Sequence, residues 1–138
     1  SARAAAWALR EAGAARVSVW NRTAGRAREL AGELGVEAVE GPLPGFDLLV
    51  NCTAVGLAEG SDQLKDLPVD DDALNVNVHV VDLVYAPGGT SLVARARAHG
   101  AGAVDGLEVL VRQGALSLER WTGVTAPLEV MRRAARGE

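Results

Sequence analysis

At residues 46–56 the sequence reads FDLLVNCTAVG. Its first five residues form a nearly continuous apolar run, and the six residues that follow are mostly small or polar. A short apolar run of this kind is typical of a strand that is buried on both faces of a parallel sheet. A second run of the same character, residues 78–83, ends just before Tyr85. The two segments predict neighbouring strands of a parallel sheet, with loops at their carboxyl ends.

Helical patterns lie on both sides of these two strands. Apolar residues at helical spacing predict a helix from Ser1 to Gly13 and a second helix from Thr23 to about Leu34. The alternating, partly β-branched segment 16–20 between them predicts a strand. The remaining expected elements are short strands at 36–39 and 103–104 and helices that begin at Thr90, Gly106 and Thr125. Strands that alternate with helices predict an α/β fold with a doubly wound, mostly parallel sheet.

Composition limits the classes of partner. The chain has 138 residues, a length that suits one domain, and its formal net charge is −4 without a basic cluster. Nucleic acid and anionic membrane surfaces are therefore disfavoured as partners. No apolar run approaches the roughly 18 residues of a membrane span, and the single cysteine, Cys52, cannot build a disulfide framework. We expect a cytoplasmic domain that binds a small molecule, with a homodimer left open as its assembly state.

The strand expected at residues 16–20 ends in a polar segment with positive charge. Asn21-Arg22-Thr23 follows the strand directly, and Arg26 comes one helical turn later. In a dinucleotide-binding unit the end of this strand meets the adenosine ribose, where a carboxylate selects NAD and an arginine accommodates the 2′-phosphate of NADP. The residues favour NADP. The alternative is that both arginines are solvated charges at the start of a helix.

Several motifs occur in a fixed order along the chain. They are Asn21-Arg22-Thr23 with Arg26; Asn51-Cys52-Thr53-Ala54-Val55-Gly56-Leu57; Asp82-Leu83-Val84-Tyr85 with Pro87, Thr90 and Leu92; Asp105-Gly106-Leu107 with Leu110, Val111, Gln113 and Gly114; and Trp121-Thr122-Gly123. In this order they resemble the shikimate dehydrogenase family, and the third and fourth motifs together are the most specific. The resemblance extends from Ser1 to the last expected helix.

The resemblance implies a function for the whole protein. Members of this family are oxidoreductases that reduce 3-dehydroshikimate to shikimate with NADPH, a step of chorismate and aromatic amino-acid biosynthesis. Residues 1–138 would be part of the Rossmann-like NADP-binding domain, and the helix from about residue 125 would pack toward a substrate domain outside this chain. The alternatives are a quinate/shikimate dehydrogenase-like paralogue and a non-catalytic NADP-binding sensor module.

The resemblance also implies roles for individual residues. The implied cofactor-binding residues are Ser1, Ala2, Asn21, Arg22, Thr23, Arg26, Thr53, Ala54, Val55, Leu83 and Gly106. Tyr85 and Gln113 would bind the hydroxyl and carboxylate groups of the substrate. The family's catalytic lysine and aspartate belong to the substrate domain, so no catalytic residue is expected here, and Lys65 is expected on a surface loop. No metal site is expected.

The start of the chain departs from the family pattern. The chain opens in helical register at Ser1, without a methionine, and the family's glycine-rich phosphate loop and first strand would precede it. In the doubly wound order 3-2-1-4-5-6 that first strand is central, and without it two half-sheets would keep unpaired inner edges. We therefore expect residues 1–138 to be a fragment that lacks the first strand, with further polypeptide upstream.

Overall fold

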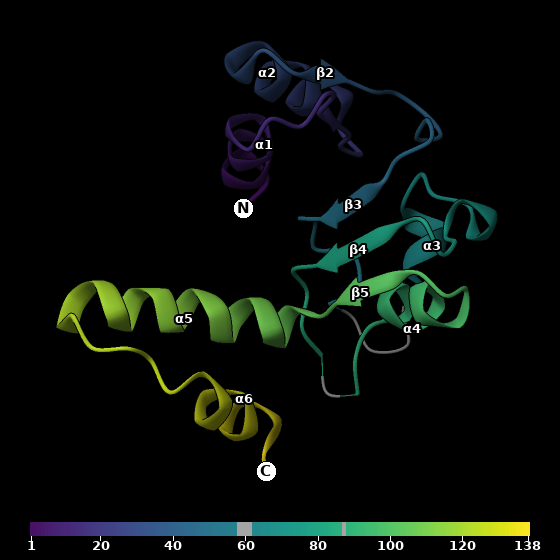
Figure 1. The fold of residues 1–138 in the computed structure, drawn as a ribbon. Helices are drawn as coiled ribbons and strands as arrows, with labels where there is room; N and C mark the ends of the chain where they lie inside the picture. Colours follow the sequence, from purple (N-terminus) through teal and green to yellow (C-terminus); the bar gives the residue numbers. More distant parts are fainter. Residues whose placement is uncertain (58–61, 87) are drawn as a thin grey trace.

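In the computed structural model the described residues are 1–57, 62–86 and 88–138. The strands are β1 (Ser18–Val19), β2 (Glu37–Ala38), β3 (Leu48–Asn51), β4 (His79–Asp82) and β5 (Gly102–Val104). The helices are α1 (Ala2–Glu11), α2 (Ala24–Leu34), α3 (Gln63–Asp66), α4 (Ser91–Ala98), α5 (Gly106–Thr122) and α6 (Leu128–Arg136), and a 3₁₀ turn covers Asp71–Ala73. Strands and helices alternate as the sequence predicts, which confirms the α/β class (Figure 1).

The strands form two parallel sheets. β1 pairs with β2, and β3, β4 and β5 pair in that order. In the larger sheet Leu48 lies opposite His79, and Asn51 lies opposite Asp82, so the last residues of β3 and β4 are neighbours. Residues of β1 and β3 both line a cavity of about 680 Å³. The prediction of mostly parallel strands is confirmed. The described strands form a two-stranded sheet and a three-stranded sheet rather than one continuous sheet.

β3 is less buried than its apolar sequence predicts. Leu48 is 39% exposed, and only Asn51 at the end of the strand is buried. Burial on both faces was therefore wrong for β3, because this strand is at the edge of its sheet and borders the cavity. β4 is the central strand of the sheet, and its Val80 is completely buried.

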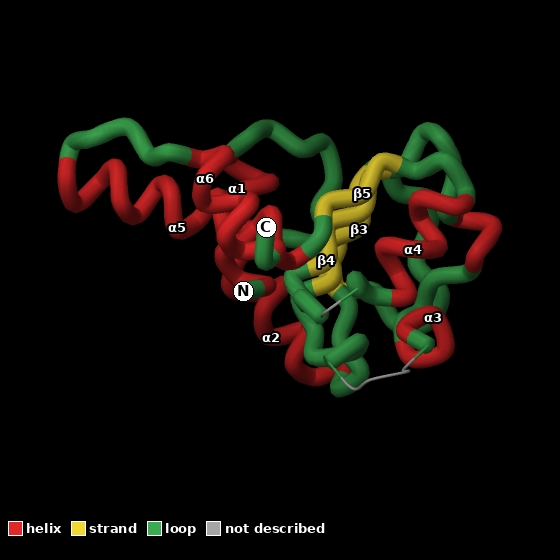
Figure 2. The backbone as a smooth tube through the Cα atoms, turned by 90° about the horizontal axis from the view of Figure 1, so that it is seen from below, coloured by secondary structure: helices red, strands yellow, loops and turns green. Residues whose placement is uncertain are grey.

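The main hydrophobic core lies between the larger sheet and α4. α4 contacts both β4 and β5. The buried residues of this core are Leu67, Val69, Leu74, Val78, Val80, Leu92, Ala96 and Ala101. α5 extends away from the sheet on the side to which the strand arrows point, and α6 lies beside it (Figures 1 and 2). The start of α5 is therefore close to the carboxyl ends of β4 and β5.

Polar residues fix where the helices begin. The Thr90 hydroxyl accepts a hydrogen bond from the Val93 N–H (3.4 Å), and a carboxylate oxygen of Asp105 accepts from the Glu108 N–H (2.9 Å). Thr125 was wrongly predicted to cap the last helix, which begins at Leu128 with Pro127 as its N-cap. A residue that precedes proline is disfavoured in the helical region, so the helix cannot include Ala126.

α6 is held to α5 mainly by ion pairs. It buries none of its residues completely. Two nitrogens of Arg132 donate to the two carboxylate oxygens of Glu108 at 2.7 and 2.8 Å, and Arg112 donates to the same carboxylate at 2.6 Å. Arg136 pairs with Asp105 at 3.1 Å. Both carboxylates belong to the start of α5, so these pairs hold α6 next to the carboxyl edge of the sheet.

The Glu108 pairs predict how the α5–α6 contact depends on pH. Hydrogen bonds from Arg132, with a further contribution from Arg112, lower the pKa of Glu108 to about 2. A carboxyl whose pKa is lowered on folding stabilises the folded state above its unfolded pKa of about 4.3. This stabilisation is lost as the pH falls from about 4.3 toward 2. We expect Glu108→Gln to speed amide hydrogen exchange in residues 128–136 at pH 7, where wild type is protected.

The matched control is Glu129→Gln. Glu129 is exposed and pairs with Arg132 within α6, so its loss should leave the protection of α6 nearly unchanged. Equal protection of α6 in wild type and Glu108→Gln at pH 7 would show that these ion pairs do not hold the helix.

Candidate functional site

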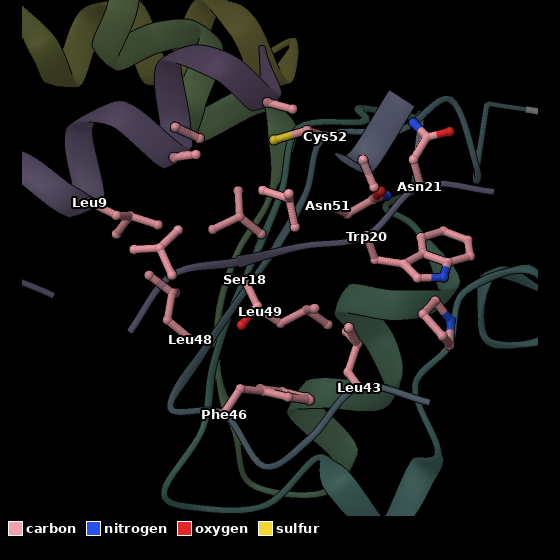
Figure 3. Close-up of a pocket in the computed structure, with 18 of the residues that line it drawn as sticks. Leu9, Ser18, Trp20, Asn21, Leu43, Phe46, Leu48, Leu49, Asn51 and Cys52 are labelled. Carbon is pink, nitrogen blue, oxygen red and sulfur yellow. The ribbon is translucent and has the colours of Figure 1, made fainter. Parts of the chain in front are cut away.

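The end of the cavity at the carboxyl edge is lined by polar residues. Figure 3 shows Asn21, Asn51 and Cys52 at one end of the cavity, and Leu43 and Phe46 at the other. Arg26 and Thr53 also belong to its lining. Ligands of open α/β sheets bind outside the carboxyl ends of the strands. The polar end of the cavity is therefore the candidate site, whereas its apolar body separates the two sheets.

The segment after β1 presents two arginines. Asn21 Oδ1 accepts a hydrogen bond from the Thr23 N–H (2.9 Å), which turns the chain into α2 with Thr23 as its N-cap. Arg22 and Arg26 are both exposed in this turn and in the first turn of α2. Within the described ranges neither of them pairs with a carboxylate, whereas Arg28 on the same helix pairs with Glu40. Two unpaired guanidiniums beside a helix N-terminus fit the charge and geometry of a phosphate group.

The loop after β3 is closed by hydrogen bonds from its own side chains. Asn51 Oδ1 accepts from the Thr53 N–H (3.0 Å) and from the Thr53 hydroxyl (2.7 Å). The same hydroxyl accepts from the Val55 N–H (3.0 Å), and Asn51 Nδ2 donates to the Val55 carbonyl (3.2 Å). Ala54 is exposed between them. These bonds give residues 51–55 one defined backbone path.

The loop after β4 and the start of α5 are in direct contact. A Cβ on Gly106 would lie 2.5 Å from the Val84 carbonyl oxygen and 2.8 Å from the Tyr85 nitrogen, so only glycine fits there. Leu83 precedes this contact and is half-buried, and Tyr85 follows it and is 57% exposed. Pro87 of the same motif lies outside the described residues. The structure thus brings Leu83, Tyr85 and Gly106 together.

The structure places the remaining predicted residues farther out. Gln113 is exposed on α5, about 10 Å along the helix from Gly106 at 1.5 Å per residue. Ser1 is the N-cap of α1, and Ala2 lines the cavity. The amino terminus lies on the side to which the arrows of β3, β4 and β5 point (Figure 1).

Lys65 lies on the surface, as the sequence predicts, but in the short helix α3 rather than in a loop. Lys65 is exposed, with its ammonium 3.9 Å from the carboxylate of Asp62. Burial raises the pKa of the Cys52 thiol, which disfavours the nucleophilic thiolate. In the part of the chain that the structure describes, no group of three or more His, Cys, Asp or Glu side chains could hold a metal ion. No helix among the described residues is long and apolar enough to cross a membrane.

Sequence reasoning gave no role to the side chains of Asn51 and Asp82. Both belong to the matching motifs, yet only the strand register shows that they are neighbours, with a hydrogen bond of 2.9 Å from Asn51 Nδ2 to Asp82 Oδ1. The available signal was a polar residue at the end of each apolar run. Two neighbouring parallel strands that end in this way place those residues side by side when their registers match.

Parallel strands joined through helices, with polar loops at their carboxyl ends, define a Rossmann-like α/β domain. A sequence profile described as Shikimate 5'-dehydrogenase C-terminal domain matches residues 106–136. The shikimate dehydrogenase (NADP(+)) of Halorubrum lacusprofundi is 43% identical over 142 residues, which cover 99% of this chain and 50% of the relative.

Two solved structures are similar over nearly the whole chain. The 5-ketofructose reductase of a Gluconobacter strain has a TM-score of 0.86 and 32% identity, covering 99% of this chain and 52% of that one. The shikimate 5-dehydrogenase of Thermus thermophilus in complex with NADP(H) and shikimate has a TM-score of 0.79 and 40% identity. The match covers 97% of this chain and 50% of that one. Over nearly its whole length the chain is similar to shikimate dehydrogenases, and the matching profile describes their C-terminal domain. The chain spans about half the length of the curated relatives that it matches.

Proposed function

We propose that this chain binds NADP(H) and that the full-length protein reduces 3-dehydroshikimate to shikimate. The observation that supports the cofactor best is the pair of exposed arginines that follows β1, Arg22 and Arg26, which form no ion pair with any carboxylate among the described residues. A carboxylate at this position would favour NAD instead. The relatives named as NADP(+)-dependent shikimate dehydrogenases and the Thermus thermophilus complex support the same assignment.

The cofactor would lie along the carboxyl edge of the sheets. Arg22 and Arg26 would hold the adenosine 2′-phosphate, with Asn21 and Thr23 beside the ribose. The N-terminus of α1, at Ser1 and Ala2, would face the pyrophosphate, because helix N-termini present free N–H groups to anions. The proposed neighbours of the nicotinamide half are Thr53, Ala54, Val55, Leu83 and Gly106.

Bound NADPH supplies the hydride for the reduction, and this chain supplies substrate contacts. Tyr85 and Gln113 are both exposed, and their phenol and amide groups are neutral donors and acceptors that suit a substrate rich in hydroxyl groups. Proton transfer is assigned to residues of a substrate domain outside this chain. α5 exposes Leu116 (67%) and Trp121 (83%) near its far end, and we propose that this domain packs against α5 and α6.

The cavity between the two sheets supports the proposal that a further strand, outside this chain, lies between them. The cavity is lined mainly by apolar residues of α1, β1 and β3. A parallel strand placed there would pair with β1 on one side and with β3 on the other, which gives the doubly wound order 3-2-1-4-5-6. We propose that residues 1–138 are the part of the domain that surrounds this strand, and that the protein works in the cytoplasm.

The reaction is tested with the full-length protein by following NADPH absorbance with 3-dehydroshikimate as substrate. We expect turnover with NADPH and a kcat/KM at least about tenfold lower with NADH, since losing one charge-assisted contact costs about 1.5 kcal/mol or more. Oxidation of quinate with NAD in preference to shikimate with NADP would instead assign the protein to the quinate paralogues. Binding of NADP without turnover of either substrate would favour the alternative of a non-catalytic sensor module.

A further inference from the structure

The neighbouring strands β3 and β4 end in a pair of buried polar side chains. Asn51 ends β3 and is 3% exposed, and Asp82 ends β4 and is completely buried. The strand register places them side by side, and Asn51 Nδ2 donates to Asp82 Oδ1 at 2.9 Å. Neither side chain contributes to the apolar core that packs under α4.

Asp82 also binds the two segments that follow it. Its Oδ1 accepts from the Val84 N–H (3.0 Å), and its Oδ2 accepts from the Thr90 hydroxyl (2.7 Å). Thr90 in turn caps α4. The carboxylate therefore links the loop after β3, the loop after β4 and the start of α4.

The carboxylate determines which way the Asn51 amide faces. Both carboxylate oxygens of Asp82 accept hydrogen bonds from their other neighbours, so the amide must turn its NH₂ group toward Asp82. Its carbonyl oxygen then faces the opposite way, where it accepts both hydrogen bonds from Thr53. The reverse orientation would place oxygen against oxygen at Asp82 and nitrogen against the Thr53 donors, which is costly for buried groups.

We propose that Asp82 is a positioning residue for the cofactor site, and that it acts by orienting Asn51, which in turn fixes the backbone of residues 53–55. The identity of the ligand rests on the proposed function. Through Val84 the same carboxylate fixes the loop that carries Leu83 and Tyr85. One buried carboxylate thus sets the relative placement of the proposed cofactor loop and the proposed substrate loop.

Asn51→Asp in the full-length protein tests this inference. The substitution keeps the size of the side chain and an oxygen for Thr53, but it replaces the donor to Asp82 with a second carboxylate. We expect the Kd for NADP to rise about tenfold, equivalent to about 1.4 kcal/mol. Amide exchange at Thr53 and Val55 should accelerate, while exchange at Val80 in the buried part of β4 stays unchanged.

Asn75→Asp is the matched control. Asn75 shares one local contact with Asn51, since its Oδ1 accepts from the N–H two residues later, that of Asn77 (3.0 Å), whereas its Nδ2 donates to the Ala73 carbonyl (3.3 Å). It is exposed and precedes β4, at the opposite edge of the sheet from the site. We expect neither the Kd for NADP nor the exchange at Thr53 and Val55 to change.

A second variant, Asp82→Asn, separates hydrogen bonding from charge. The carbonyl of the new amide still accepts from Asn51 and Val84, and its NH₂ group can donate to the Thr90 hydroxyl oxygen in place of the bond that this hydroxyl donates in wild type. We therefore expect NADP affinity to stay within about threefold of wild type. If Asn51→Asp does not fold, Asn51→Leu removes the amide without adding a charge and should produce the same rise in Kd.

Three results have distinct meanings. Unchanged exchange at Thr53 and Val55 in Asn51→Asp, or a Kd that does not rise, overturns the positioning role. A loss of affinity in Asp82→Asn as large as in Asn51→Asp also overturns it, because charge would then matter rather than the orientation of Asn51. Faster exchange in Asn51→Asp together with a wild type that binds no NADP leaves the positioning of the loop in place and refutes the proposed function.

Discussion

Replacing Arg22 and Arg26 together with alanine is expected to raise the Kd for NADP about 100-fold and to leave the Kd for NAD within about twofold. Hydrogen bonds to a charged group contribute roughly 1.5–3 kcal/mol each, and exposure places these two arginines at the lower end of that range. Two such contacts give about 3 kcal/mol, or two powers of ten in affinity. Arg22→Ala alone should raise the Kd for NADP about tenfold. Isothermal titration of the full-length protein with each cofactor measures both constants.

Arg28→Ala is the control for this effect. Arg28 lies on the same helix but pairs with Glu40, so it is not expected to contact the cofactor. Its removal subtracts the same charge from α2 and should leave the preference for NADP unchanged. If Arg28→Ala weakens NADP as much as Arg22→Ala does, the arginines attract the cofactor only through their overall charge. The assignment of a specific 2′-phosphate site would then be wrong.

Gly106→Ala is expected to destabilise the protein by about 3 kcal/mol, the upper part of the usual range for overpacking. The new Cβ would meet the Val84 carbonyl oxygen at 2.5 Å and the Tyr85 nitrogen at 2.8 Å. Both are backbone atoms, so the loop after β4 or the start of α5 must move. Because Tyr85 belongs to that loop, turnover should fall as well. Chemical denaturation measures the change in the free energy of unfolding.

Gly114→Ala, on the same helix, is the matched substitution. Its Cβ would lie 3.4 Å from the end of the flexible Met131 side chain, which can shift. Alanine is favoured over glycine in a helix interior by about 0.5–1 kcal/mol, so this variant should be slightly more stable than wild type. Equal effects of the two substitutions would mean that the close contact at Gly106 does not constrain the site.

Local sequence patterns predict much of this fold because the strands β3 and β4 are short and largely apolar. The runs at residues 46–50 and 78–83 locate β3 and β4 to within two residues at either end. The exposure of Leu48 could not be predicted in the same way, since it depends on which strand lies beside β3. The start of α6 was misplaced because the capping preference of Thr125 was given more weight than the restriction imposed by Pro127.

The candidate site was predictable where one segment carries the chemistry. Arg22 and Arg26 follow a strand directly, so their place at the carboxyl edge follows from the sequence alone. The pairing of Asn51 with Asp82 depends on the register of two strands, and the pairs between α5 and α6 join residues 24 to 31 positions apart. No local pattern specifies such contacts, and these contacts hold the loops and helices around the site.

The preference of the unmodified full-length protein for one dinucleotide is the most direct test of the guanidinium pair as a phosphate site. Calorimetric titrations with NADP and with NAD, in the same buffer, should give a Kd at least about tenfold lower for NADP. Equal constants, or tighter binding of NAD, would contradict the assignment of Arg22 and Arg26 to the 2′-phosphate.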